Sequence, residues 1–266
     1  MNNTKSFFMH FLFIVLFGFS GLFAQNIEAV GKNIATDKQG NNVYQVDVNG
    51  ITIGYKLIGS GEPLVMIMGL GGTMNEWPKE TLDILSQKYQ LVLLDNRGMG
   101  YSTANDTEFS YKLFANDVLG LMDKLSIEKA DVLGFSMGSV ITQQLLITEP
   151  QRFKKAIIYA SSTDGYEVTQ HLQGKMPDNF IVKRQYEASI GWKTPMDKLA
   201  LVKNQVMFII GTGDSIVGVE PTKAMASAIP GAWMIQFKNG QHTLMIQAPK
   251  RFAKTVLLFL EIDESI

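Results

Sequence analysis

The chain of 266 residues contains no cysteine. This absence excludes disulfides, thiolate-bound metals, iron–sulfur clusters and a cysteine nucleophile. Histidine is almost as rare, because only His10, His171 and His242 are present. A histidine-rich metal site is therefore not expected, and a reaction that needs an imidazole must use one of these three side chains. The 24 basic residues nearly balance the 25 acidic residues, so no basic surface for nucleic acid is indicated.

Long apolar runs are also absent, with one exception at the amino terminus. Residues 7–24 include 14 apolar residues out of 18 and follow a short polar segment that carries Lys5. A positive start, an apolar middle and a small residue before a polar stretch are typical of a secretory signal peptide, so residues 1–24 are predicted to be cleaved after Ala24. The alternative is an uncleaved membrane anchor, although a bilayer span needs ~20 apolar residues. The sequence predicts an exported protein, periplasmic or secreted, without stable membrane association after cleavage.

The remaining chain, residues 25–266, alternates apolar strands with helical patterns. Two β-rich runs meet at Asn49-Gly50, the strongest short signal for an antiparallel hairpin. Six further apolar runs are predicted strands: residues 63–68, 90–95, 130–135, 155–160, 206–211 and 232–237. Apolar strands that alternate with helices imply a mainly parallel sheet covered on both faces. We therefore predict a single α/β domain with an antiparallel hairpin at one edge of its sheet.

One interval interrupts this alternation. Residues 162–204 have mixed polarity and are punctuated by glycine and proline. We interpret them as a short insertion over one sheet edge, a lid, rather than as a second domain. The aromatic side chains of Phe180, Tyr186 and Trp192 either give the lid an apolar underside or anchor it to the core.

The segment GFSMG, residues 134–138, carries the clearest chemical signal. It has the pattern G-x-S-x-G directly after a predicted strand and directly before a helix. Such a tight turn places Ser136 in a strained backbone conformation and needs small residues two positions away on each side. The hydroxyl would then project above the sheet, beside the amino end of a helix with its positive dipole. We predict that Ser136 is a nucleophile.

A serine nucleophile needs a base, and the base needs a carboxylate that orients it. His242 follows the last predicted strand, and such strand ends form the sites of open α/β sheets. His10 lies in the predicted leader and His171 lies in the insertion, so His242 is the predicted base. Asp214 follows the strand at residues 206–211 and is the predicted acid, with Asp164 as the alternative because it also follows a strand.

Acyl transfer also needs donors for the developing oxyanion. The backbone N–H of Met137, next to the nucleophile, would supply one donor. The loop Gly69-Leu70-Gly71-Gly72 follows a predicted strand and would bring the Leu70 N–H as the second donor. Nucleotide-binding motifs of the G-x-G-x-x-G and P-loop types are absent from the sequence, as is the zinc motif H-E-x-x-H. Neither a metal nor an organic cofactor is expected.

With these motifs in order, the chain resembles the α/β-hydrolase fold family. The matching segments are GLGGTMNEW, DNRGMGYS, GFSMG, GTGDSIV and GQH. They span nearly the whole mature chain and are specific for the fold and for a Ser-Asp-His triad, but not for the substrate. Two departures stand out: Met68 precedes Gly69 where the family often has histidine, and the lid is short. The resemblance together with the short lid implies a relatively open or shallow pocket.

The resemblance implies a serine hydrolase that acts on a small carboxylic ester or lactone. A C–C bond hydrolase or a cofactor-free perhydrolase with the same triad is the alternative reaction. A ligand-binding protein on a hydrolase scaffold, without catalysis, is the alternative of a different class. The acyl and alcohol groups of the substrate and the oligomeric state do not follow from the sequence.

Five further residues receive structural interpretations. Asp95 and Arg97 belong to the turn DNRGMGYS and are expected to brace the loop beside the site. Asp117 and Asp123 fall on the polar side of a predicted helix and are expected to be solvated. Trp77 is expected to pack at the start of a helix, with a place in the pocket wall as the alternative.

Overall fold

The computed structural model describes residues 26–175 and 178–262. The predicted signal peptide, residues 1–24, lies outside these described residues, so its cleavage and the export that it implies stay predictions. Within the described ranges, no helix combines the length and the apolar character that a membrane span requires.

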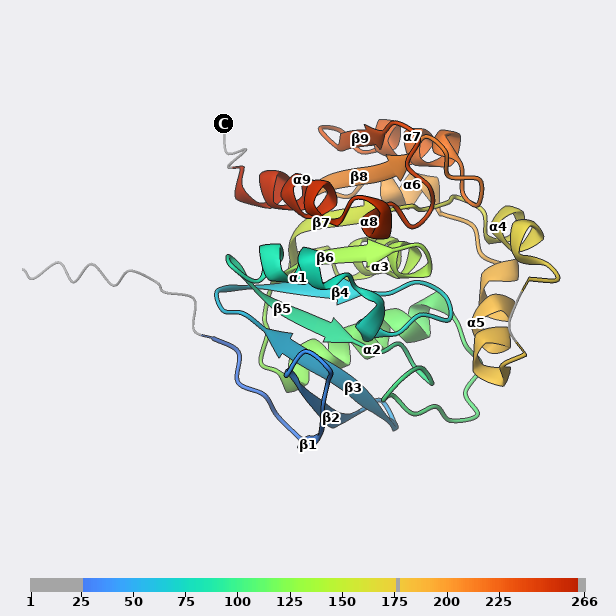
Figure 1. Ribbon diagram of the computed structural model, residues 1–266. Coiled ribbons are helices and arrows are strands. Elements are labelled where there is room, and N and C mark those ends of the chain that lie inside the picture. The colour runs from blue at the N-terminus through green and yellow to red at the C-terminus, as the bar shows by residue number, and fades with distance from the viewer. Residues whose placement is uncertain (1–25, 176–177, 263–266) are drawn as a thin grey trace, which may run out of the picture.

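The described residues form a nine-stranded sheet with the strand order β1-β2-β3-β5-β4-β6-β7-β8-β9 (Figure 1). Pairing is antiparallel from β1 to β5 and parallel from β5 to β9. The strands are β1 (Lys32–Thr36), β2 (Asn42–Val48), β3 (Ile51–Ile58), β4 (Glu62–Ile67), β5 (Tyr89–Leu94), β6 (Ala130–Phe135), β7 (Phe153–Tyr159), β8 (Gln205–Gly211) and β9 (Trp233–Phe237). The predicted α/β architecture with an antiparallel hairpin at one edge is confirmed, and β1 adds one edge strand that the sequence analysis did not include.

Helices cover both faces of the sheet, because the central strands are apolar on both sides. One face packs α1 (Lys79–Leu85), α8 (Leu244–Gln247) and α9 (Pro249–Glu261), and the other packs α2 (Tyr111–Lys124), α3 (Met137–Thr148), α6 (Met196–Leu199) and α7 (Val219–Ala228). The short 3-10 helices η1 (Met74–Glu76) and η2 (Pro150–Arg152) precede α1 and β7. Strands β5 and β6 are buried along their whole length, as strands between two helical layers must be.

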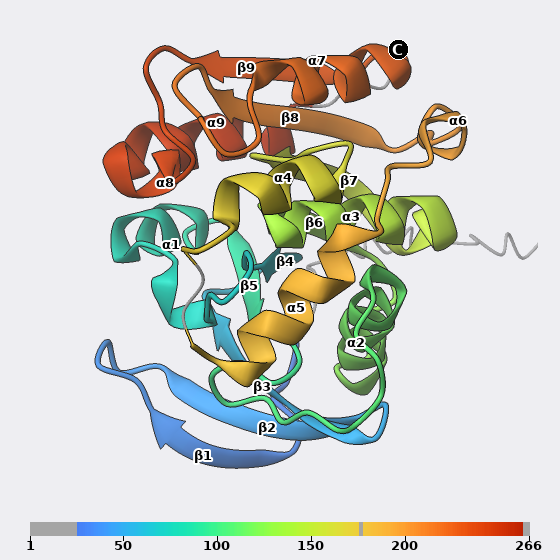
Figure 2. The same cartoon turned by 90° about the vertical axis from the view of Figure 1, so that its right-hand side faces the viewer.

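The lid consists of α4 (Gly165–Leu172), α5 (Phe180–Ile190) and α6. Figure 2 shows α4 and α5 lying across the carboxyl ends of the central strands. The insertion therefore covers the end of the sheet where the catalytic candidates lie, rather than a lateral edge strand.

One structural prediction for this part of the chain is wrong. Asp117 of α2 is not solvated, because only 2% of its surface is exposed. Its carboxylate accepts hydrogen bonds from Nε and Nη2 of Arg97, at 2.8 and 2.6 Å. Burial raises the pKa of Asp117 and the Arg97 hydrogen bonds oppose this effect. The buried ion pair fastens the turn of residues 95–102 to α2, while Asp123 is exposed as expected.

Candidate active site

Ser136 sits in a strained turn between β6 and α3. Its backbone has φ of 53° and ψ of −117°, a conformation that costs a non-glycine residue about 1–3 kcal/mol. The flanking glycines are required by contact: a Cβ at Gly134 would lie 2.2 Å from the Gly138 carbonyl oxygen, and one at Gly138 would lie 2.2 Å from that of Ile67. The Ser136 N–H donates to the Tyr159 carbonyl at 2.9 Å. The predicted tight turn with small flanking residues is therefore present.

Asp214 lies in the loop after β8 with its side chain fully buried. Its Oδ1 accepts hydrogen bonds from the backbone N–H groups of Ile216 and Val217, at 2.9 and 3.2 Å. Its Oδ2 lies 2.8 Å from Nδ1 of His242. Burial alone would raise the pKa of Asp214, but the hydrogen bonds from His242 and from these N–H groups hold it below its usual value. The carboxylate is therefore charged at neutral pH, although it is buried.

His242 lies in the loop after β9, where its ring bridges the other two residues. Its Nε2 is 2.9 Å from Oγ of Ser136, and its Nδ1 faces Asp214. The His242 carbonyl accepts a hydrogen bond from the Tyr159 hydroxyl at 2.6 Å, and the ring packs against Phe135 with centroids 5.1 Å apart. The structure thus brings together the three residues that the sequence analysis selected.

The charge of Asp214 fixes the tautomer of His242. An ionised carboxylate accepts hydrogen bonds and cannot donate them, so Nδ1 must carry the ring proton. Neutral Nε2 is then an acceptor that faces the Ser136 hydroxyl. This arrangement has the geometry in which a histidine removes the proton of a serine during nucleophilic attack.

Two loops hold these side chains in register. The Gly213 N–H donates to the Gly240 carbonyl at 2.9 Å, and the Thr212 N–H donates to the Phe237 carbonyl at 2.9 Å. The loop of Asp214 and the loop of His242 are thus joined through their backbones, which fixes the distance between carboxylate and imidazole without long flexible side chains.

The predicted oxyanion donors lie beside the nucleophile. A Cβ at Gly69 would lie 3.1 Å from Cβ of Ser136, so the loop after β4 passes close to the serine. Among the described residues, the N–H groups of Leu70 and Met137 have no hydrogen-bond acceptor. Met137 is the first residue of α3, where N–H groups are left unpaired by the helix. Both groups are free to bind an oxygen above Ser136.

A narrow pocket opens next to Ser136, beneath the lid. Its volume is about 40 Å³, room for the centres of a few water molecules. Within the described residues, the wall has no charged side chain and comprises Leu70, Tyr111, Ser136, Met137, Val140, Ala160, Ser162, Gly165, Val168, Thr169, Leu172, Ser189, Trp192 and Val217. Thr169 and Leu172 of α4 and Ser189 of α5 form part of this wall, so the short lid reaches the pocket. The open or shallow shape expected from the sequence stays a prediction.

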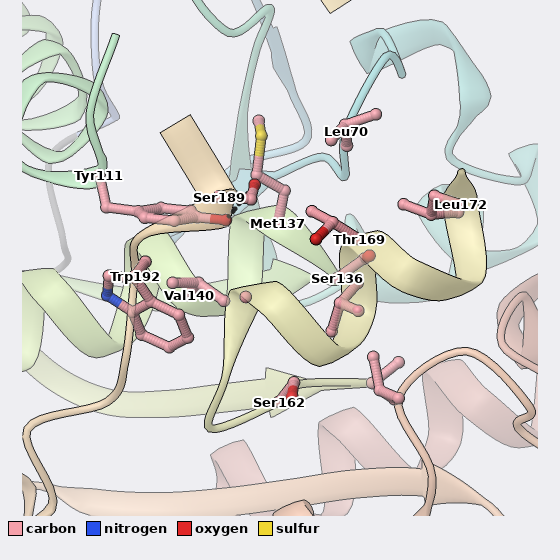
Figure 3. Close-up of a pocket in the computed structure, with 14 residues that line it drawn as sticks. Leu70, Tyr111, Ser136, Met137, Val140, Ser162, Thr169, Leu172, Ser189 and Trp192 are labelled. Carbon is pink, nitrogen blue, oxygen red and sulfur yellow. Dashed lines mark hydrogen bonds between the residues drawn. The ribbon is translucent and has the colours of Figure 1, made fainter. Parts of the chain in front are cut away.

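One end of the pocket is polar. The Tyr111 hydroxyl and Oγ of Ser189 are 2.8 Å apart, and Figure 3 shows them meeting away from Leu172, which lies at the other end. Burial raises the pKa of Tyr111 to about 12, so the hydroxyl keeps its proton. The rest of the wall is mostly apolar but includes the hydroxyl side chains of Ser162 and Thr169.

Other predicted residues lie away from the triad. Asp164 caps α4 by accepting from the Tyr166 N–H at 2.8 Å, and its carboxylate pairs with Lys193 at 3.0 Å. It makes no contact with His242, so the geometry favours Asp214 as the acid. His171 is an exposed residue of α4. Trp77 is buried in the core, as expected.

Asp95 and Arg97, which were predicted to brace the loop beside the site, both make side-chain hydrogen bonds within the fold. Asp95 accepts hydrogen bonds from the Met74 and Tyr101 N–H groups, at 2.7 and 2.8 Å, and so braces the turn, whereas Arg97 pairs with Asp117.

The three aromatic residues of the lid have different surroundings. Trp192 lines the pocket. Tyr186 anchors α5 to α4, and Phe180 is 73% exposed.

Sequence reasoning did not find Tyr159, Gln185 or Ser189. Tyr159 lies in an apolar strand run, and the other two lie on α5, where no motif marks them. Their partners are distant in the sequence: Gln185 contacts Gly71, which is 114 positions away. The contacts of α5 with the loops of the sheet only become visible in three dimensions.

The described residues contain no group of three or more histidine, cysteine, aspartate or glutamate side chains that could hold a metal ion. The chemistry of the triad needs none.

Over part of its length, the chain is similar in sequence to a known family. The sequence profile of the alpha/beta hydrolase fold matches residues 62–181, which include Leu70 and Ser136. A protein of Synechocystis sp., provisionally named a non-heme chloroperoxidase, is 34% identical over 111 residues, 41% of this chain and 40% of that protein. This match thus spans about two fifths of the relative. The 2-hydroxymuconate semialdehyde hydrolase of Pseudomonas sp. is 24% identical over 76% of this chain and 88% of its own length.

Solved structures extend the likeness to nearly the whole fold. The enol-lactonase of Burkholderia xenovorans superposes with a TM-score of 0.71 at 21% identity, covering 82% of this chain and 100% of that structure. At this identity the superposition speaks for the fold alone. Together with the family profile and the nine-stranded sheet, it shows that the chain has the α/β-hydrolase fold.

Proposed function

We propose that this protein is a serine hydrolase that cleaves a small carboxylic ester or lactone through an acyl-enzyme. The observation that carries the proposal is the continuous hydrogen-bonded chain from Ser136 Oγ to His242 Nε2, at 2.9 Å, and from His242 Nδ1 to Asp214 Oδ2, at 2.8 Å. Nucleophile, base and orienting acid are all within the distances that general-base catalysis requires.

In the first half of the reaction, Oγ of Ser136 forms a bond to the carbonyl carbon while its proton passes to Nε2 of His242. The carbonyl oxygen becomes an oxyanion between the N–H groups of Leu70 and Met137. Asp214 stabilises the imidazolium that forms. The bond to the alkoxy oxygen then breaks, and the proton on His242 goes to that oxygen as the alcohol leaves.

In the second half, water attacks the acyl-enzyme. His242 takes a proton from this water, and a second tetrahedral oxyanion forms in the same place. Its collapse breaks the bond to Ser136 Oγ, which recovers the proton from His242, and the carboxylic acid is released. In a lactone, the alcohol and the acid stay joined in one product.

The pocket supports a small and mostly apolar acyl group. Its wall is mostly apolar, with polar side chains at Tyr111, Ser189, Ser162 and Thr169 besides Ser136, and carries no charge among the described residues. A charged acyl group would lose hydration in this pocket without finding a partner. The enol-lactonase among the structural neighbours is compatible with this substrate class.

A test of the proposal is the variant Ser136→Ala. We expect turnover of p-nitrophenyl acetate to fall by about 10³-fold or more, because triad residues act as a unit. A fluorophosphonate probe should label the wild-type protein at Ser136 and should not label the variant. A wild-type protein that is neither labelled nor active would favour a binding protein on a hydrolase scaffold. Unchanged turnover by Ser136→Ala would contradict the proposal directly.

A second candidate reaction, peroxide-dependent perhydrolysis, is favoured by the 34% identity to the provisionally named chloroperoxidase. It would use the same Ser136 acyl-enzyme with hydrogen peroxide in place of water. An assay with acetate, bromide and peroxide separates the two: oxidation of bromide faster than ester hydrolysis would favour the perhydrolase.

The export predicted from residues 1–24 stays part of the proposal. Detection of the mature protein outside the cytoplasm, with an amino terminus at Gln25, would support it.

A further inference from the structure

The oxyanion loop is held from the lid by a single buried side chain. Gln185 of α5 is fully buried, and its Oε1 accepts a hydrogen bond from the Gly71 N–H at 2.8 Å. Gly71 follows Leu70 directly, so this contact acts on the peptide next to the proposed oxyanion donor. The loop has one other backbone restraint, the Gly72 N–H to the Gly69 carbonyl at 3.2 Å.

Packing confirms that α5 rests on this loop. A Cβ at Gly71 would lie 3.4 Å from Cγ1 of Val182, which precedes Gln185 by nearly one helical turn on the same face. Ser189, one turn further along that face, meets Tyr111 in the pocket. The buried face of α5 therefore contacts the oxyanion loop with one part and the pocket wall with another.

The amide of Gln185 is satisfied at one end only. Oε1 can accept a hydrogen bond from an N–H group and Nε2 cannot, so the contact with Gly71 fixes the orientation of the amide. Nε2 is then buried and, among the described residues, has no hydrogen-bond partner. An apolar side chain of the same size would avoid this unpaired donor. Packing alone does not account for a glutamine at this position.

We infer that Gln185 is a positioning residue that couples closure of the lid to the geometry of the oxyanion hole. The inference rests on the proposed serine-hydrolase function. With α5 seated, the Gly71 peptide is held and the neighbouring Leu70 N–H points to the place where the oxyanion forms. Without this hydrogen bond, the glycine-rich loop keeps its internal turn and its packing against Val182. The Leu70 donor then loses its fixed direction.

The variant Gln185→Met tests the inference, because methionine keeps the length of the side chain but offers no comparable acceptor. We expect kcat for p-nitrophenyl acetate to fall by about 10- to 100-fold, less than the 10²–10³-fold typical of removing an oxyanion donor outright. KM should change by no more than about threefold, since the Gly71 contact acts in the transition state. The thermal midpoint should be unchanged or higher.

A transition-state analogue separates positioning from simple packing. A small alkylboronic acid forms a tetrahedral adduct with a catalytic serine and places an oxygen in the oxyanion hole. Its affinity should fall with kcat/KM in Gln185→Met. The matched control is Tyr186→Phe, which removes the hydrogen bond from α5 to the Thr169 carbonyl but does not touch the oxyanion loop. The control should keep kcat and boronate affinity within about twofold, because Tyr186 is not among the residues that line the pocket and its bond does not involve the oxyanion loop.

The outcomes are distinct. Unchanged kcat and boronate affinity in Gln185→Met, or a loss confined to KM and thermal midpoint, would overturn the inference. Equal losses in Tyr186→Phe would overturn it as well. If Gln185→Met does not fold, Gln185→Asn serves the same purpose, because its amide is one methylene too short to reach Gly71. Fluorophosphonate labelling of wild-type Ser136 shows separately that the proposed function stands.

Discussion

The catalytic loops and the lid border the same pocket but are held in place by different means. The loops of Ser136, Asp214 and His242 are fixed by neighbouring parallel strands, by close backbone contacts and by loop-to-loop hydrogen bonds. The geometry of the triad is therefore a property of the sheet itself.

The lid depends on a few side-chain contacts. Thr194 donates to the buried amide oxygen of Gln143 at 2.9 Å, and Gln185 accepts from Gly71. Arg184 of α5 donates to the carbonyls of Asn105 and Thr107 and lies over the Phe109 ring at 3.8 Å. Each contact is a single interaction that a substitution can remove. The comparison indicates that the chemistry rests on backbone geometry, whereas access and positioning rest on exchangeable side chains.

The largest expected effect separates the two candidate acids, one from each region. Asp214→Asn should lower kcat by about 10³–10⁴-fold, because an amide in place of the carboxylate favours the wrong histidine tautomer. Asp164→Asn, in the lid, should change kcat by no more than roughly twofold, because it removes only a partly exposed ion pair with Lys193. Steady-state kinetics of the two purified variants measure this difference. A larger loss in the Asp164 variant would reverse the assignment of the acid.

The next effect compares two glycines. In Gly134→Ala the new Cβ would lie 2.2 Å from the Gly138 carbonyl oxygen. We expect a loss of about 100-fold in activity, since small displacements of a nucleophile are costly, and of about 1–3 kcal/mol in the free energy of unfolding. Gly191 of the lid has no atom within 4 Å of such a Cβ, so Gly191→Ala should stay within about 0.5 kcal/mol. Urea unfolding of both variants measures the two changes in the free energy of unfolding. Equal losses in the two variants would contradict the contrast between sheet and lid.

The smallest effect is a difference in pH dependence. Burial raises the pKa of Asp131 in β6 to about 6, against smaller opposing effects of the Lys155 N–H and of nearby lysines. Its unfolded pKa is about 3.9. Between these two values the native protein binds more protons than the unfolded chain, so Asp131 makes stability fall as pH rises from about 4 to about 6. Above about pH 6 this contribution is constant.

Asp131→Asn should remove that slope and raise stability at pH 7 by about 1–3 kcal/mol relative to wild type. The lid residue Asp164 behaves oppositely, because its hydrogen bond with Lys193 lowers its pKa. The contribution of Asp164 to the free energy of unfolding is complete above its pKa in the unfolded chain. This contribution is lost only as pH falls through the lower pKa of the folded protein. Asp164→Asn should therefore leave the slope between pH 4 and 6 unchanged. Denaturant unfolding at pH 4.5 and 7.5 gives the free energy of unfolding of the three proteins. An equal change of this free energy with pH in wild type and Asp131→Asn would refute this account.

The same contrast explains what the sequence could predict. Strands and the turn around Ser136 are encoded locally, by apolar runs and by glycines at fixed spacing, so the sheet and the G-x-S-x-G turn were predictable. His242 and Asp214 were found because parallel strands end at one side of a sheet. These inferences need only the order of strands along the chain.

Contacts between distant side chains were not predictable. Asp117 was expected to be solvated because the period of a helix shows which face is polar, not which partner covers it, and its partner Arg97 comes from a separate loop. The link from Gln185 to Gly71 has no local signal either. The course of α4 and α5 across the strand ends was not predictable from the length of the insertion.

A pocket wall without charged side chains treats substrate and product differently. A neutral ester or lactone enters it without losing a strongly held hydration shell. The acid that is released ionises at neutral pH, and within this wall its carboxylate would have no positively charged partner among the described lining residues. Burial of such an unpaired charge is costly, so the product is expelled toward water as soon as it ionises. In the proposed hydrolysis, the pocket thereby disfavours inhibition by the product acid.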